Sequence, residues 1–169
     1  FVLVQWIGTR QTIFLVALVL VVMSLLFGSL WRARLASLVG VALFVGLGGF
    51  SSLSGALDSE CVRESSYFCI QVTDDIVDGR YKVKALRLDK LLHSYVSLDD
   101  PTLLVYGYTK IFAEMGALVA QDNPGFRVLF IGGGGYTVPR FLEEVYPRSA
   151  VEVIEVDPEV TRVAFDYLG

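Results

Sequence analysis

Four consecutive glycines, Gly132, Gly133, Gly134 and Gly135, follow the short apolar run RVLFI at residues 127–131. Glycine lets a backbone bend sharply and approach a ligand without interference from a Cβ atom. The N–H groups of such a loop, with the amino end of a following helix, favour an anionic or electron-rich group. The glycines therefore predict a ligand-binding loop.

Glu155 is the second residue that indicates chemistry. It lies in the apolar run VEVIEV at residues 151–156, 21 residues after Gly134. An acid at the end of the second strand of a nucleotide-binding unit accepts hydrogen bonds from ribose hydroxyls, at an interval of about 20 residues. No six-residue frame in the loop completes G-x-G-x-x-G. The pattern therefore leaves room for a nucleoside without a phosphate, as in S-adenosyl compounds.

The elements around these residues form a recognisable order. The sequence predicts buried parallel strands at 127–131 and 151–156, with a helix at about 138–146 between them. Asp157 and Pro158 suit the N-cap and first residue of a further helix. Strand, glycine loop, helix, strand and helix make an incomplete Rossmann-like α/β domain of the S-adenosyl-nucleoside-binding type, which we assign to residues 101–169.

The preceding segment, residues 58–100, reads as a small β-rich region. The alternating runs SYFCIQVT at 66–73 and YKVKALRL at 81–88 flank a turn at Asp78-Gly79, which predicts a β-hairpin. After it, Asp100-Pro101 is expected to open a helix that runs to about Ala120.

Residues 1–57 differ sharply in composition. They hold three of the 32 charged residues, while the whole chain is 54% hydrophobic with a mean hydropathy of +0.58. The uncharged runs 11–31 and 35–57 predict two transmembrane helices. We therefore expect a multi-pass protein of the bacterial inner membrane, with the lipid bilayer as a partner and the side of its polar domain left open. Because the chain starts at Phe1, we also expect it to be a fragment.

Net charge and cysteines limit other functions. A charge of −4 and a pI near 4.9 argue against a nucleic-acid partner. Cys61 and Cys69 are either free thiols or, in an oxidising compartment, a disulfide. With His93 as the single histidine, no metal site is predicted.

Several segments together resemble spermidine synthase (polyamine aminopropyltransferase), particularly the bacterial membrane-fused kind. They are Glu64 to Tyr67, LRLDKLLHS, RVLFIGGGGYTVPRFLEEVYP and VEVIEVDPEV. The resemblance implies transfer of an aminopropyl group from decarboxylated S-adenosylmethionine to a polyamine. It implies that Gly132 to Gly135 line the nucleoside site, that Glu155 holds the ribose, and that His93 stands at a donor-site position. It also implies that Tyr106 or Tyr108 adjoins the amine.

The chain departs from the family pattern at Phe68, His93 and Tyr136, each beside an expected ligand contact. In the family the catalytic base lies on a later strand, so no catalytic residue is assigned here and we expect it downstream of Gly169. Two alternatives stay open. One is a non-catalytic nucleoside-sensing domain fused to a transporter-like bundle, and the other is a methyltransferase that uses S-adenosylmethionine.

Overall fold

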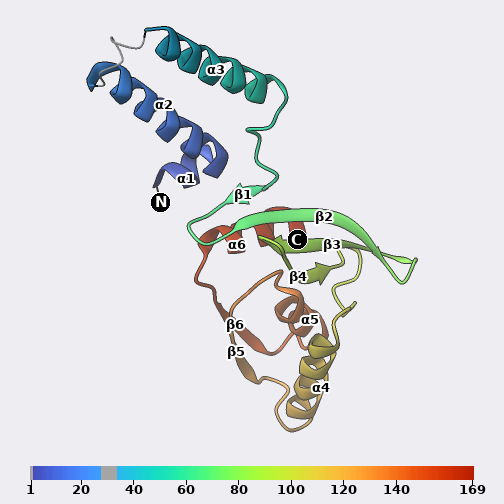
Figure 1. The fold of residues 1–169 in the computed structure, drawn as a ribbon. Helices are drawn as coiled ribbons and strands as arrows, with labels where there is room; N and C mark the ends of the chain where they lie inside the picture. The colour runs from blue at the N-terminus through green and yellow to red at the C-terminus, as the bar shows by residue number, and fades with distance from the viewer. Residues whose placement is uncertain (1, 28–33) are drawn as a thin grey trace. The chain divides into compact units, whose positions relative to one another are not determined.

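The structure, a computed structural model, describes residues 2–27 and 34–169. It divides into two compact units, Phe1–Glu60 and Cys61–Gly169 (Figure 1). The predicted domain boundaries after residues 57 and 100 stay predictions.

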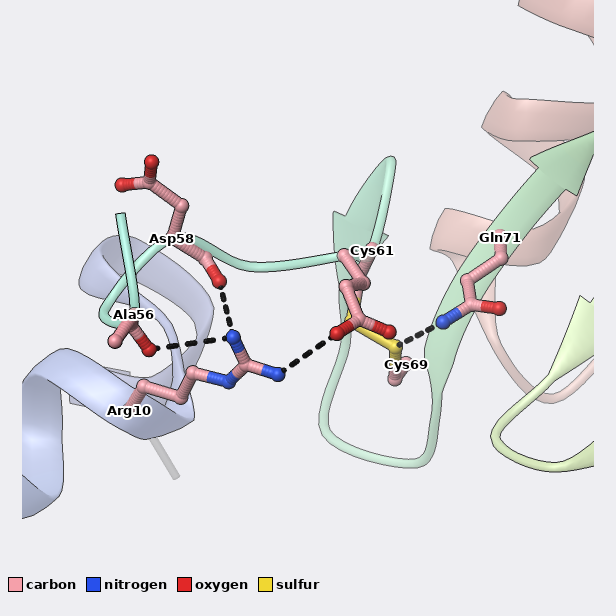
Figure 2. A network of polar contacts seen from close by, with 7 residues as sticks. Arg10, Ala56, Asp58, Cys61, Cys69 and Gln71 are labelled. Carbon is pink, nitrogen blue, oxygen red and sulfur yellow. Dashed lines mark hydrogen bonds and ion pairs between the residues drawn. A yellow bond between two sulfur atoms is a disulfide. The ribbon is translucent and has the colours of Figure 1, made fainter. Parts of the chain in front are cut away.

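The first unit consists of the helices α1 (Val2–Ile7), α2 (Thr9–Phe27) and α3 (Arg34–Leu53). Gly8, with φ of 83°, separates the first two helices. The rings of Phe14 and Phe44 stack at 5.5 Å and join α2 to α3. The Arg10 guanidinium donates to the carbonyls of Ala56 (3.3 Å) and Asp58 (2.6 Å), as Figure 2 shows. These contacts tie the segment after α3 to the start of α2.

The two predicted membrane spans are wrong for the described residues: no helix in 2–27 or 34–169 has both the length and the apolar character to cross a bilayer. Of the first predicted span, 11–31, the structure describes residues 11–27, which lie in α2. Residues 28–31 of that predicted span lie outside the described residues. The second predicted span loses its last four residues because α3 ends at Leu53. This finding contradicts the predicted transmembrane helices and the predicted multi-pass membrane location. It also gives no support to the lipid bilayer as a partner.

The second unit begins with a four-stranded antiparallel sheet in the order β1-β2-β3-β4. Its strands are β1 (Arg63–Glu64), β2 (Cys69–Val77), β3 (Tyr81–Leu88) and β4 (Leu91–Val96). The predicted hairpin is present between β2 and β3, and its tip has positive φ at Asp78 (54°) and Gly79 (64°). Two such residues form the turn whose twist matches the flanking strands.

The α/β part of the predicted fold follows. Strands β5 (Arg127–Ile131) and β6 (Ala150–Ile154) pair in parallel, and α5 (Thr137–Val145) connects them. Helix α6 (Pro158–Val163) and the π-helical turn η2 (Ala164–Leu168) end the chain. Asp157 caps α6 as predicted, because its side chain accepts a hydrogen bond from the Glu159 N–H.

Two apolar clusters hold this unit together. In the first, α6 and η2 pack against the antiparallel sheet; its buried residues are Ile70, Leu86, Leu88, Val96, Val160, Val163, Ala164 and Leu168. In the second, α5 packs on the β5–β6 pair around Phe126, Val138 and Leu142. Figure 1 shows α6 beside the antiparallel sheet and α5 beside the parallel pair. The glycine loop, which joins β5 to α5, therefore lies where both packed layers meet.

Helix α4 (Gly107–Asp122) starts later than the sequence predicts. The Asp100 carboxylate accepts hydrogen bonds from the Thr102 N–H (2.9 Å) and hydroxyl (2.6 Å), so Asp100 closes a local turn and does not cap a helix. Tyr106 is still extended, with ψ of 142°, and the helix begins after it.

Cys61 and Cys69 form a disulfide, one of the two alternatives that the sequence leaves open (Figure 2). The bond joins the residues before β1 to the first residue of β2, eight positions apart. It closes the loop that connects these two strands.

Candidate functional site

The glycine loop makes a tight bend directly after β5. Gly132 and Gly134 have φ of 94° and 52°, a region that L side chains rarely adopt. A Cβ atom on Gly133 would lie 2.5 Å from the Tyr136 ring, so this position has no room for a side chain. The Gly132 N–H continues the parallel pairing by donating to the Ile154 carbonyl (2.7 Å). The loop thus starts at the carboxyl ends of both strands.

Glu155, the residue after β6, binds this loop directly. Its Oε2 accepts a hydrogen bond from the Gly133 N–H (2.7 Å), and its Oε1 accepts one from the Asp157 N–H (3.0 Å). Burial by itself raises the pKa of Glu155, but the backbone N–H groups of Asp157, Gly133, Gly134 and Val156 together hold the pKa below its ordinary value. The site therefore presents an ionised carboxylate beside the glycine bend at neutral pH.

Ser94 of β4 supports the loop from the antiparallel sheet. It is buried, and its Oγ accepts a hydrogen bond from the Gly135 N–H (3.0 Å). Next to it, the Thr137 hydroxyl donates to the Tyr95 carbonyl (3.2 Å). The last glycine of the loop and the first residue of α5 are thereby hydrogen-bonded to β4.

His93 is the neighbour of Ser94, but it is exposed and does not contact the loop in any hydrogen bond found among the described residues. Successive side chains of a strand point to opposite faces. His93, however, is the extra residue of a β-bulge, because Leu86 pairs with Ser94 and Arg87 with Leu92, so it stands outside this alternation. Sequence reasoning missed Ser94, although Ser94 and Val96 stand two positions apart in one strand and so share a face.

The two candidate tyrosines lie in a row of aromatic rings. Tyr106 is 5.4 Å from Tyr95 and 5.7 Å from Tyr108, and the row continues through Phe112 to Phe130. The Tyr106 hydroxyl donates to the Leu92 carbonyl (3.4 Å). Burial, together with the neighbouring tyrosines, raises the pKa of Tyr106. Tyr106 is half-buried, whereas Tyr108 is exposed.

A cavity of about 620 Å³ lies between α4, β5 and α5. Among the predicted site residues, Gly132, Gly133 and Tyr108 line it, and Ser94 forms another part of its wall. His93, Tyr106 and Glu155 are not among its lining residues. The structure thus brings Glu155 and the loop together by hydrogen bonds, and it brings the loop and Tyr108 together around this mostly apolar cavity.

Tyr136, which follows the glycines, does not line that cavity. Its hydroxyl shares a hydrogen bond with the Thr161 hydroxyl (2.9 Å), and its ring lies 5.6 Å from Phe165. Its φ is 56°. The side chain therefore packs toward α6 and η2, and its ring also lies against Gly133, where a Cβ atom would be 2.5 Å away. Within residues 2–27 and 34–169, no group of three or more His, Cys, Asp or Glu side chains is arranged to hold a metal ion.

The fold of this chain is similar to that of a known class of enzyme. The chain is similar to the crystal structure of a probable spermidine synthase from Corynebacterium glutamicum, with a TM-score of 0.54 and 24% identity. The match covers 62% of this chain and 38% of that one. The second unit is thus an α/β fold of the kind seen in spermidine synthases.

Sequence comparisons support a more particular relationship. No family model matches the chain. Over 83 residues it is 35% identical to a polyamine aminopropyltransferase from Chromobacterium violaceum, a stretch that covers 48% of this chain and 31% of the relative. Over 41 residues it is 46% identical to a polyamine aminopropyltransferase from Vibrio vulnificus, covering 24% of this chain and 14% of the relative. The resemblance to the spermidine synthase family is confirmed, and the chain spans less than a third of the length of these relatives.

Another relative has a different name. Over 83 residues the chain is 31% identical to an eEF1A lysine and N-terminal methyltransferase from Xenopus laevis. This match covers 43% of this chain and 12% of that protein.

Proposed function

We propose that the glycine loop, Gly132 to Gly135, and Glu155 bind the nucleoside part of an S-adenosyl compound. The observation that carries this proposal is the 2.7 Å hydrogen bond from the Gly133 N–H to the Glu155 carboxylate. It places an ionised acid at the carboxyl ends of two parallel strands, where α/β sheets bind their ligands. A carboxylate offers about four acceptor positions, and the two short backbone contacts occupy two. Ribose hydroxyls would share this carboxylate with the backbone N–H groups that lower its pKa.

The activity that we propose for the whole protein is aminopropyl transfer from decarboxylated S-adenosylmethionine to a polyamine. The amine nitrogen attacks the aminopropyl carbon beside the sulfonium, the carbon–sulfur bond breaks, and the sulfur keeps the electron pair in methylthioadenosine. The amine then loses a proton. The residues described here contribute binding and orientation. Tyr106 and Tyr108 are proposed for the amine side, because an aromatic face attracts a cation.

A methyltransferase is the second candidate function. It is supported by the similarity to the Xenopus laevis protein that is named a methyltransferase. Such an enzyme would use S-adenosylmethionine itself, so the proposed roles of the loop and of Glu155 stay the same. The two candidates differ in the group that leaves the sulfonium sulfur, which is an aminopropyl group in the first and a methyl group in the second.

Calorimetric titration of the full chain with methylthioadenosine and with S-adenosylhomocysteine tests both candidates. Tighter binding of methylthioadenosine, followed by aminopropyl transfer to putrescine in the parent protein, is the expected result. At least about tenfold tighter binding of S-adenosylhomocysteine would instead indicate methyl transfer. Binding without transfer of either group by the parent would indicate a non-catalytic nucleoside sensor. Absence of binding at millimolar concentrations of both ligands would overturn the nucleoside site.

A further inference from the structure

A chain of three hydrogen bonds joins the loop after β1 to the glycine loop. The Ser65 hydroxyl donates to Oδ2 of Asp157 (2.5 Å). The Asp157 N–H donates to Oε1 of Glu155 (3.0 Å), and Oε2 of Glu155 accepts from the Gly133 N–H (2.7 Å). Ser65 and Gly133 are thus connected through two carboxylates, although 68 positions separate them in the sequence.

The first two members of this chain are buried. Ser65 is 6% exposed and Asp157 is 1% exposed. Ser65 Oγ also accepts hydrogen bonds from the N–H groups of Tyr67 (3.0 Å) and Phe68 (2.9 Å). These two contacts use the acceptor capacity of the hydroxyl, and its hydrogen has its closest acceptor in Asp157. The orientation of the Ser65–Asp157 bond is therefore fixed.

The segment that carries Ser65 is anchored at both ends. The disulfide between Cys61 and Cys69 closes it (Figure 2), and the Cys69 N–H donates to the Asp89 carboxylate (2.9 Å). Inside the segment, the Ser65 N–H donates to the Phe68 carbonyl (2.9 Å). A serine in a closed loop of this kind has little freedom to follow movements of Asp157.

We propose that Ser65 is a positioning residue that acts through Asp157 to hold the Glu155 carboxylate against the glycine loop. This inference rests on the proposed function only where it concerns nucleoside affinity. Ser65 fixes the Asp157 side chain, and the Asp157 backbone N–H then fixes Oε1 of Glu155. With Oε1 held, Oε2 stays in reach of the Gly133 N–H.

A purely structural role for Asp157 is separable from this positioning role. Asp157 caps α6 through Oδ1, which accepts from the Glu159 N–H (3.0 Å), while Ser65 uses Oδ2. Ser65→Ala therefore removes the positioning bond and leaves the cap in place. Ser97→Ala is a matched control, because Ser97 is equally buried (6%) and its Oγ accepts the Asp100 N–H (3.0 Å), far along the chain from Glu155.

The test compares three forms of the full chain by NMR: wild type, Ser65→Ala and Ser97→Ala. Without any nucleoside, we expect Ser65→Ala to change the Gly133 amide resonance and to raise the pKa measured at the Glu155 carboxyl carbon, while Ser97→Ala changes neither. With methylthioadenosine, Ser65→Ala is expected to raise Kd about tenfold and Ser97→Ala less than about twofold. Unchanged Gly133 and Glu155 resonances in folded Ser65→Ala would overturn the positioning role.

Asp157→Asn keeps the test decisive if Ser65→Ala does not fold. Asparagine retains the Oδ1 cap but presents an amide donor to the Ser65 hydroxyl, so the same changes at Gly133 and Glu155 are expected. Their absence in folded Asp157→Asn would also overturn the proposal. If the wild-type chain binds no methylthioadenosine, the proposed function is contradicted but the positioning role is not. The positioning role is tested separately, by the Gly133 and Glu155 resonances measured without ligand.

Discussion

The carboxylate of Glu155 and the backbone N–H of Gly133 are joined by a hydrogen bond of 2.7 Å that crosses from the end of β6 to the loop after β5. Parallel pairing of the two strands brings these residues together, since Ile131 and Ile154 are register partners. A negative group thereby faces the bend that the glycines make. This relationship defines the candidate nucleoside site more closely than the neighbouring cavity does.

Replacing Glu155 by glutamine should weaken nucleoside binding. The amide keeps the size of the side chain but has only one acceptor oxygen, so either the Gly133 or the Asp157 N–H would face an NH₂ group. We expect Kd for methylthioadenosine to rise by about one to two orders of magnitude in a calorimetric titration. Glu152→Gln is the matched control, since Glu152 lies on β6 three residues before Glu155 and makes an exposed ion pair with Arg127. Equal losses in both variants would contradict the assignment.

Ser94→Ala should destabilise the second unit. The Gly135 N–H is buried and would lose its acceptor, which costs roughly 1–3 kcal/mol of unfolding free energy. The neighbouring His93→Ala changes an exposed side chain and should cost less than about 0.5 kcal/mol. Urea unfolding of both variants measures the difference. A larger loss of unfolding free energy for His93→Ala than for Ser94→Ala would contradict the assignment of Ser94 as the side chain of β4 that supports the loop.

The lowered pKa of Glu155 predicts a pH dependence with a definite sign. A carboxyl group whose pKa is lower in the folded state stabilises the fold above its unfolded pKa, about 4.3 for glutamate, and this contribution is lost as the pH falls through the folded value. The unfolding free energy of wild type relative to Glu155→Gln should therefore be constant near neutral pH and shrink in acid below about pH 4.3. A difference that grows on acidification would have the wrong sign. The glutamine variant isolates Glu155 from the other carboxylates of the chain.

Reduction of the Cys61–Cys69 disulfide should lower stability. The bond closes a short loop, residues 61–69, and loop-closure entropy predicts a loss of roughly 2.5 kcal/mol when it opens. Unfolding in the presence and absence of dithiothreitol measures this loss, with a thiol assay to verify reduction. The double variant Cys61→Ser/Cys69→Ser should not respond to the reductant. Equal stability of oxidised and fully reduced wild type would contradict the prediction.

Local patterns in the sequence predicted much of the second unit. The Asp78-Gly79 turn, the run before the glycines and the Asp157-Pro158 cap each form a feature that depends on a few adjacent residues. Such features need no knowledge of distant contacts. Glu155 was also accessible to sequence reasoning, because its interval from the glycines follows from the length of a strand–helix–strand unit.

Features that depend on long-range contacts were missed. Ser65 and Ser94 contact the site from β-region residues whose pairing with α6 and the glycine loop no local pattern reveals. The start of α4 was misplaced because Asp100 bonds Thr102 instead of capping a helix. The predicted membrane spans took an uncharged run for a continuous helix, whereas α3 ends at Leu53 and the described residues contain no spanning helix.

The central claim is that the glycine loop and Glu155 together bind a ribose-bearing nucleoside. Paired titrations of the wild-type chain with methylthioadenosine and with its 2′,3′-dideoxy analogue test it most directly, because the analogue lacks only the hydroxyls that Glu155 is proposed to accept. We predict that methylthioadenosine binds and that the analogue binds at least about tenfold more weakly. Equal affinity for the two compounds, or no binding of methylthioadenosine at millimolar concentration, would contradict the claim.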